Sequence, residues 1–121
     1  MAEDSKFLAV FLGDPTGARR REWDALTDEQ RRAREAEGIP AWKAWVEKNA
    51  GAIVELGGPL GKTKRVTGDG IEDAGNNLAA FTVVRAESHE AAAKLFEGHP
   101  HFTIFPGEAV EIMPLLPIPG A

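Results

Sequence analysis

The segment Leu78-Ala-Ala-Phe-Thr-Val-Val-Arg-Ala86 decides the fold, together with residues 88–97 and 107–115 that follow it. These three parts predict a strand, a helix and a second strand. Ser88 favours the start of the helix, because its hydroxyl can accept a hydrogen bond from a free backbone N–H of the first turn. Gly98 favours its end, because a helix often closes on a residue with left-handed backbone.

Both predicted strands carry apolar side chains on both faces. In the first, Phe81 and Val83 point to one side while Ala80 and Val84 point to the other, since successive side chains alternate. In the second, Glu111 alone interrupts an apolar run. A sheet with one face in water alternates more clearly between apolar and polar residues. We therefore expect an apolar cover on each face of the sheet.

The composition bounds the class of protein. A chain of 121 residues has the size of one domain. It has no cysteine, which excludes disulfides, thiolate metal sites and a cysteine nucleophile. It also shows no secretory signal pattern and no apolar run of the roughly 20 residues that a membrane span needs. We expect a single cytoplasmic domain over 1–121, with its core at about 5–115 and a proline-rich tail at 116–121.

The charge distribution argues against nucleic-acid binding. The net charge is −5, with 12 basic and 11 acidic residues in 1–68 but 2 basic and 8 acidic residues in 69–121. The basic clusters at 19–21 and 31–34 are interleaved with acidic residues. Such mixed charge is typical of a solvated helix surface, whereas a nucleic-acid-binding face is strongly basic.

The rest of the chain predicts alternating strands and helices. Thr27 and Gln30 form a capping-box pattern at the start of a helix over 27–50, which we expect to be broken or bent near Gly38 because Pro40 follows. The other expected segments are a strand at 6–12, a polar connection at 16–26, a strand at 52–56, a tight loop at 57–61, an optional strand at 62–66 and an exposed loop at 67–77.

This order of elements predicts a ferredoxin-like α+β fold, βαββαβ, with both helices on one face of the sheet. The second face would then be bare in a monomer, although its side chains are apolar. A second copy of the chain, packed sheet on sheet about a two-fold axis, would cover it. We therefore expect a homodimer.

Two short motifs suggest binding chemistry. The run from Gly57 to Thr63 contains Gly-Lys-Thr, but Leu56 stands where a phosphate loop needs its first glycine, and no helix follows. Lys62 is left as a lone anion contact. His99-Pro100-His101 places two histidines one residue apart, which suits an acid/base pair or a shared metal. Alternatively, one histidine caps a helix end and the other lies in a loop.

Candidate metal ligands and aromatic walls complete the set. His89 lies at the far end of the predicted helix and is expected at the surface, so a metal at the histidine pair lacks a third ligand, and neither metal nor cofactor is expected. Trp42 and Trp45 share a helix face; they are either core residues or the wall of a pocket between helix and sheet, beside Phe81.

Three stretches resemble the YCII-related family, which includes the DGPF-domain proteins. They are Ala41-Trp-Lys-Ala-Trp-Val46 leading to Gly57-Gly58-Pro59-Leu60, Phe81-Thr-Val-Val-Arg-Ala-Glu-Ser88 before a helix, and Gly98-His99-Pro100 before Gly107-Glu-Ala-Val-Glu-Ile112. The resemblance covers about residues 5–115 and implies a ferredoxin-like fold that dimerises into an α+β barrel.

The resemblance also bears on the site. Some relatives pair a helix histidine with the aspartate of an Asp-Pro dipeptide. Here His99-Pro100 takes the place of that dipeptide, and the helix around Ala41 has no histidine, so this dyad is absent and only His99 inherits a role. One relative is a chloromuconolactone dehalogenase, and others have no assigned activity.

The sequence thus supports two functions. The first is a dimeric domain that binds a small molecule near Trp42, Trp45, Phe81 and the histidine pair, with Lys62 as an anion contact. As an enzyme it would carry out a lyase or isomerase step on a small acid or lactone, with His99 and His101 as acid/base residues. The alternative is a non-catalytic dimeric module that binds a protein partner, which the acidic C-terminal half and the proline-rich tail favour.

Overall fold

The computed structural model describes residues 4–120, so residues 1–3 of the predicted domain and Ala121 of the predicted tail lie outside the described part. The elements, in chain order, are β1 (Ser5–Leu12), α1 (Ala18–Asp24), α2 (Asp28–Lys48), β2 (Ile53–Pro59), β3 (Thr63–Thr67), β4 (Gly70–Ala74), β5 (Leu78–Ala86), α3 (His89–Lys94), α4 (Pro100–Thr103) and β6 (Ala109–Pro114). None of the helices within residues 4–120 is both long and apolar enough to cross a membrane.

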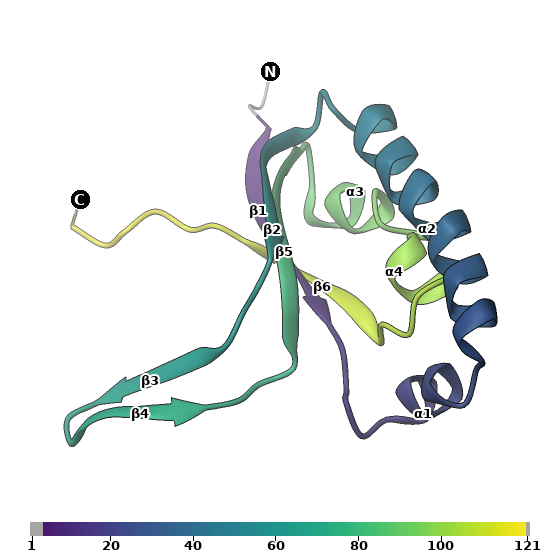
Figure 1. Cartoon of the computed structure of the whole chain (residues 1–121). Coiled ribbons are helices and arrows are strands. Elements are labelled where there is room, and N and C mark those ends of the chain that lie inside the picture. Colours follow the sequence, from purple (N-terminus) through teal and green to yellow (C-terminus); the bar gives the residue numbers. More distant parts are fainter. Residues whose placement is uncertain (1–3, 121) are drawn as a thin grey trace.

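The main sheet has four strands in the order β2-β5-β1-β6, and all neighbouring strands are antiparallel. Helices α2, α3 and α4 all lie on one side of this sheet (Figure 1). The chain is therefore a mixed α+β protein whose antiparallel sheet is covered by helices on one face. We call this the covered face and the opposite one the open face.

The hydrophobic core lies between the covered face and the helices. β1 contributes alternate residues, Phe7, Ala9 and Phe11, all of which are buried. Phe96 and Trp45 meet them from the helical layer, with ring centroids 5.0 Å apart. Side chains along β1 alternate between the two faces, so one set packs in the core while Leu8 and Val10 lie on the open face.

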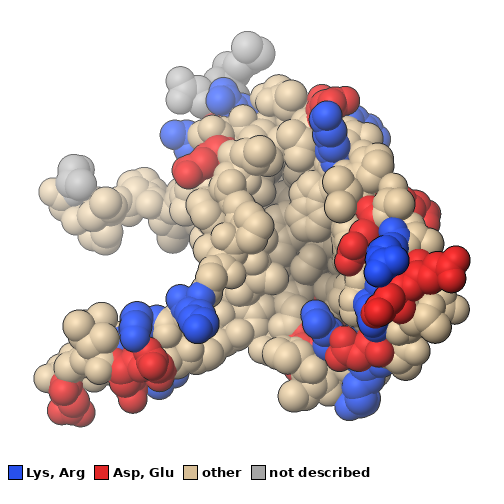
Figure 2. Space-filling model, viewed as in Figure 1, with Lys and Arg blue, Asp and Glu red and all other residues tan. Residues whose placement is uncertain are grey.

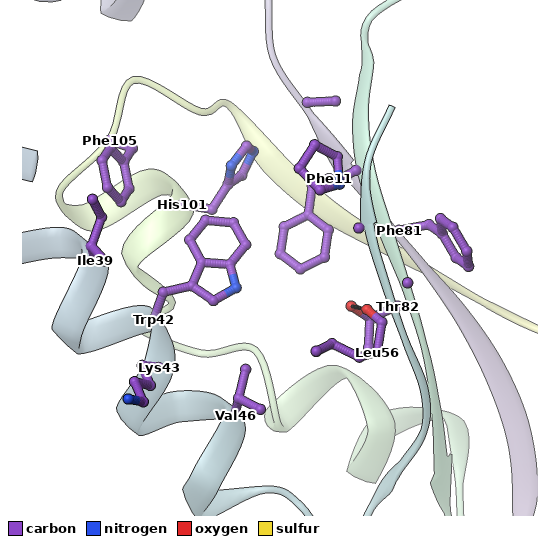
Figure 3. Close-up of a pocket in the computed structure, with 15 residues that line it drawn as sticks. Phe11, Ile39, Trp42, Lys43, Val46, Leu56, Phe81, Thr82, His101 and Phe105 are labelled. Atoms are coloured by element: carbon purple, nitrogen blue, oxygen red, sulfur yellow. Dashed lines mark hydrogen bonds between the residues drawn. The ribbon is translucent and has the colours of Figure 1, made fainter. Parts of the chain in front are cut away.

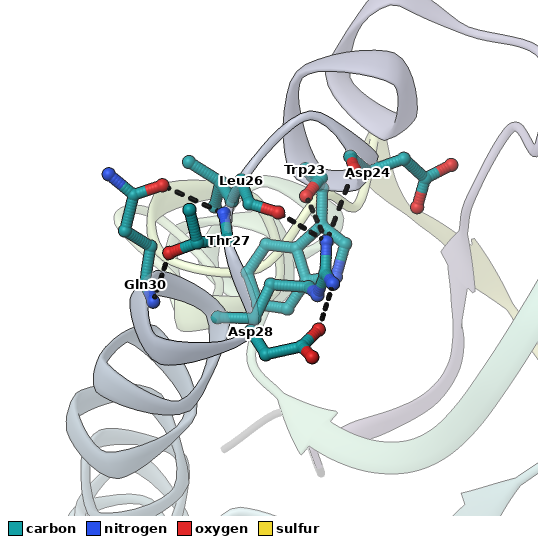
Figure 4. A network of polar contacts seen from close by, with 7 residues as sticks. Trp23, Asp24, Leu26, Thr27, Asp28 and Gln30 are labelled. Atoms are coloured by element: carbon teal, nitrogen blue, oxygen red, sulfur yellow. Dashed lines mark hydrogen bonds and ion pairs between the residues drawn. The ribbon is translucent and has the colours of Figure 1, made fainter.

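Helix α2 is continuous, which corrects the predicted break near Gly38. Thr27 and Gln30 form the expected capping box, with the Gln30 N–H donating to the Thr27 hydroxyl over 3.1 Å (Figure 4). Pro40 lies inside the helix. Gly38 is buried because Phe105 packs on it, and an added Cβ would lie 2.5 Å from that ring. Gly38 therefore serves close packing and not a helix end.

The connection expected at 16–26 contains a short helix, α1, that the sequence pattern did not reveal. The Arg31 guanidinium, in the first turns of α2, donates to the backbone carbonyls of Trp23, Asp24 and Leu26, at 3.3, 3.2 and 2.6 Å (Figure 4). A cation suits the free carbonyls at the end of a helix. A side chain from the next helix thus stabilises the end of α1.

Strand β2 runs three residues further than predicted, to Pro59. Its pairing with β5 shifts twice, and Gly57 has a φ of +67°, which favours glycine. A Cβ at Gly57 would lie 2.1 Å from the Phe81 carbonyl oxygen. The expected loop at 57–61 is therefore mostly an irregular continuation of the strand, in close contact with its neighbour.

The segment predicted as an optional strand and a loop forms a hairpin of its own. β3 and β4 pair with each other and with no strand of the main sheet. The hairpin and the tail, residues 115–120, both extend away from the body on the side opposite the helices (Figure 1). Their apolar side chains are exposed, with Val66 at 73% and Ile71 at 74% on the hairpin and Leu116 at 77% and Ile118 at 76% on the tail.

Candidate ligand-binding site

A cavity of about 640 Å³ lies between α2 and the β2–β5 side of the sheet. Figure 2 shows the hollow in the middle of the molecule, with no charged side chains in its depth and charged residues around it. Its lining is apolar apart from Lys43, Thr82 and His101; the apolar members are Phe11, Ile39, Trp42, Val46, Leu56, Gly57, Gly58, Pro59, Ala79, Ala80, Phe81 and Phe105. This volume suits a small organic molecule.

Of the two predicted tryptophans, one forms the wall of the cavity and the other belongs to the core. Trp42 extends from α2 into the cavity and faces Phe11, with ring centroids 5.3 Å apart (Figure 3). Trp45 is buried, and its indole N–H donates to the Leu95 carbonyl over 2.7 Å. Both interpretations made from the sequence therefore hold, one for each residue.

His101 lines the cavity, and its ring is held on two sides. Its Nε2 lies 2.7 Å from the Leu12 carbonyl oxygen. Gly107 packs against the ring so closely that a Cβ there would lie 2.3 Å from Nε2. Burial lowers the pKa of His101, although the bond to Leu12 opposes that shift. The imidazole is therefore neutral at neutral pH.

His99 is completely buried behind the cavity wall, with 0% of its surface exposed. Its ring lies among aromatic rings, 4.5 Å from Trp42 and 4.8 Å from Trp45 between centroids. Its Nδ1 accepts the His101 backbone N–H over 3.0 Å and so caps α4. Burial, and secondly the charge of His101, lower the pKa of His99 to about 4.

The two histidines therefore have different roles: His99 caps α4, and His101 lines the cavity. In the neutral ring of His99, Nδ1 is an acceptor, so Nε2 carries the proton. This Nε2 is the one buried side-chain polar atom without a hydrogen-bond partner among residues 4–120. His99 does not belong to the lining, whereas His101 does. The alternative that one histidine caps a helix applies to His99, although the helix is the following one.

The other two predicted binding residues, Phe81 and Lys62, differ in their relation to the cavity. Phe81 pairs with Val10 on the open face, and Figure 3 shows its ring on the far side of the strands from Trp42. Phe81 nevertheless belongs to the cavity lining, and its carbonyl oxygen lies against Gly57. Lys62 lies at the base of the hairpin, beside a separate polar hollow that includes Asp73. Phe81 therefore lines the cavity although its ring lies on the open face, whereas Lys62 lies apart from the cavity.

Several lining residues could not be anticipated from their own sequence context. Ile39 and Val46 face the cavity because α2 is unbroken, and Thr82 faces it because β5 alternates. The Thr82 hydroxyl is already used, since it donates to the Leu56 carbonyl over 2.8 Å. A helix periodicity carried through Pro40 would have placed Ile39, Trp42 and Val46 on one face.

The remaining histidine is exposed, as expected. The Nε2 of His89 lies 2.7 Å from the Ile112 carbonyl oxygen, and its ring stacks on Phe7 with centroids 5.4 Å apart. Within the described part of the chain, no three histidine, aspartate or glutamate side chains gather closely enough to hold a metal ion.

Comparison with known proteins gives a limited result. No protein-family model and no curated protein matches the chain. Among solved structures, it is similar to 5-chloro-2-hydroxyhydroquinone dehydrochlorinase from Burkholderia phenoliruptrix AC1100 in complex with 2,5-dihydroxybenzoquinone. The TM-score is 0.49 and the identity 20%, over 89% of this chain and 90% of that chain. A similarity of this size assigns no activity.

Proposed function

We propose that this chain is a homodimeric small-molecule-binding domain of the YCII-related type. Its ligand occupies the cavity between α2 and the sheet. The observation that carries the proposal is a cavity of about 640 Å³ whose apolar wall contains a buried, neutral histidine, His101. Apolar pockets with a few well-placed polar groups are typical ligand sites.

The mouth of the cavity supports ligand binding as well. Ile39 on α2 and Leu56 on β2 stand at the cavity with 64% and 50% of their surfaces exposed. Exposed apolar side chains that flank an apolar hollow gain free energy when a ligand removes them from water, at about 25 cal/mol per Å². A molecule with an apolar body is therefore favoured over a polar one.

The topology supports the family assignment. The order β2-β5-β1-β6, with two helical crossovers on one face, supports the proposed ferredoxin-like fold once the inserted β3–β4 hairpin is set aside. The proposed family in turn implies the α+β barrel dimer.

Catalysis, if the ligand is a substrate, is assigned to His101 before His99. The neutral His101 ring borders the cavity and can accept a proton from a bound small acid or lactone and return it in a lyase or isomerase step. His99 is sealed among aromatic rings, so its part is to hold the backbone of His101.

The open face supports the dimer. Its centre is apolar, with Leu8 opposite Val83 and Val10 opposite Phe81. Lys6 lies opposite Arg85 at one end of this face, and Glu111 lies beside Val10.

None of these three charged residues forms an ion pair within residues 4–120. A face with an apolar centre and unpaired charges of both signs can complement a copy of itself, as a two-fold interface requires. The hairpin and the tail extend from the sheet on this side and would contact the second protomer (Figure 1).

Ligand binding can be tested with the dye 8-anilinonaphthalene-1-sulfonate. We expect Val46→Phe, which fills the cavity from α2, to weaken binding of the dye at least tenfold. Ala44→Phe places the same ring on an exposed position of the same helix and is the matched control, expected to bind like the wild type. Equal affinities for the two variants would contradict the proposal.

A non-catalytic protein-interaction module is the second candidate, and the exposed Leu116 and Ile118 of the tail favour it. The two candidates differ in what the cavity does. This second function is preferred if two results are found together. The affinity for the dye is the same in Val46→Phe as in the wild type, and the dimer persists when the tail is removed after Pro114, which leaves the tail available to bind another protein.

A further inference from the structure

The proton on the cavity histidine has a fixed position. A carbonyl oxygen offers only lone pairs, so the His101 nitrogen that lies 2.7 Å from the Leu12 oxygen must donate. Nε2 therefore carries the proton of the neutral ring, and Nδ1 carries a lone pair. Gly107 leaves no room for the ring to turn away, because even a Cβ would lie 2.3 Å from Nε2.

The lone pair on His101 Nδ1 is unused. Among residues 4–120, the ring nitrogens of this histidine pair that form hydrogen bonds are His101 Nε2 and His99 Nδ1, and His101 Nδ1 forms none. This atom is also not sealed, since His99 Nε2 alone is both buried and unpartnered in that range. His101 borders the cavity, so Nδ1 is open to what the cavity holds.

The other polar side chains of the lining do not duplicate this acceptor. The Thr82 hydroxyl proton is committed to the Leu56 carbonyl. Lys43 is exposed on α2 and belongs to the rim. The apolar interior therefore makes two polar demands. The Trp42 indole N–H, which has no hydrogen-bond partner within residues 4–120, needs an acceptor, and His101 Nδ1 needs a donor.

We infer that the ligand of this cavity is a molecule with an apolar body and an O–H or N–H group that donates to His101 Nδ1. This inference deepens the proposed function and rests on it. An apolar ligand without a donor would bury the lone pair unpaired, and the oxygens of a carboxylate directed at Nδ1 could not donate to it. An unpaired buried acceptor costs roughly 1–3 kcal/mol, which corresponds to about a 5- to 150-fold loss of affinity.

The selectivity can be measured with two probes of nearly the same shape, 1-naphthol and 1-methoxynaphthalene. Isothermal titration calorimetry of the wild-type protein should show 1-naphthol binding at least tenfold more tightly. In His101→Phe, which keeps a ring but has no lone pair, the two affinities should become equal. Gly107→Ala, which pushes the ring from its place, should also reduce the difference.

A second readout does not depend on folding of the variants. In the ¹⁵N spectrum of the wild-type histidines, the ligand-free protein should show His101 protonated at Nε2, and its Nδ1 signal should shift with 1-naphthol but not with the ether. Equal binding of both probes, or a proton on Nδ1, would overturn the donor requirement and leave the cavity proposal intact. Failure of both probes together with the anilinonaphthalene dye would overturn the proposed function itself.

Discussion

The two faces of the sheet are built from the same strands but differ in how deeply their side chains are buried. On the covered face, Phe11 is 1% exposed and packs against the rings of Trp42 on α2, Phe96 just after α3 and His101 on α4. On the open face, Phe81 is only half-buried, and the labelled helices all lie on the other side of the sheet (Figure 1). Burial therefore depends on what the chain folds over a face and not on how apolar that face is. The covered face determines stability, and the open face is available for assembly.

The largest effect should come from truncating the same residue type on the two faces. Phe11→Ala should lower the free energy of unfolding by about 3–5 kcal/mol, because it leaves a cavity among packed rings. Phe81→Ala should cost less than about 1 kcal/mol in the free protomer. Urea unfolding at two protein concentrations measures both. The Phe11 loss should be independent of concentration, whereas the Phe81 loss should grow with it, since it acts through the dimer.

Acid should lower the free energy of unfolding, because His99 is buried in its neutral form behind the covered face. The pKa of His99 is about 4 in the folded chain and near 6.5 when unfolded, so the unfolded chain binds the proton first as pH falls. The stability from neutral His99 is complete above pH 6.5 and lost as pH falls towards 4, about 2 kcal/mol of it between pH 7.5 and 5. His101, whose pKa is also lowered, adds in the same direction.

The variant His99→Asn isolates this effect, because its side-chain oxygen can still accept the His101 N–H that caps α4. Unfolding midpoints at pH 7.5 and 5 should differ less in the variant than in the wild type, whatever its absolute stability. An unchanged difference would show that the acid sensitivity lies in other groups.

A charge at the centre of the open face tests assembly directly. Val83→Lys, opposite Leu8, should weaken dimerisation at least 100-fold, since it buries an ammonium group without a partner. Ile39→Lys introduces the same charge at an exposed apolar position on the helix side and should leave the dimer intact. Sedimentation equilibrium gives both dissociation constants. A wild-type protein that is monomeric at micromolar concentration would refute the assembly outright.

The smallest effect should come from the hairpin. Val66 and Ile71 are paired across β3 and β4 and are exposed in the protomer. If they rest on the partner, Val66→Lys with Ile71→Lys should weaken the dimer about tenfold, in line with the loss of a modest apolar contact. The free protomer should unfold as before, because the hairpin lies outside the core. An unchanged dissociation constant would confine the interface to the sheet.

The sequence predicted the elements that local patterns determine. The structure contains the predicted strand, helix and strand from Leu78 onward and the predicted helix caps at Ser88 and Thr27. It also contains the strands with apolar side chains on both faces. The failures arose where tertiary contacts override local rules. Pro40 did not break α2, and α1 depends on the Arg31 side chain of the next helix. Of the hairpin, β3 was predicted as an optional strand, whereas β4 was assigned to a loop because its residues are mostly polar, glycine or turn-forming.

The site was predicted in part, for the same reason. Trp42 and His101 were recognised as chemistry-bearing residues and both lie on the cavity wall. His99 was expected to be the reactive partner, but which of two neighbouring histidines faces a cavity depends on helix α4, which starts between them. Phe81 was predicted beside the pocket and belongs to its lining, but its ring lies with that of its cross-strand partner Val10 on the open face.

Gly57 has a consequence for how such a cavity can change over time. Its floor is formed by main chain, where β2 bulges against the Phe81 carbonyl and tolerates no side chain. The shape of the floor is therefore preserved by one glycine, while Ile39, Trp42 and Val46 on α2 can be exchanged without disturbing it. Laboratory evolution of new ligand preferences should draw its substitutions from that helix and leave position 57 untouched.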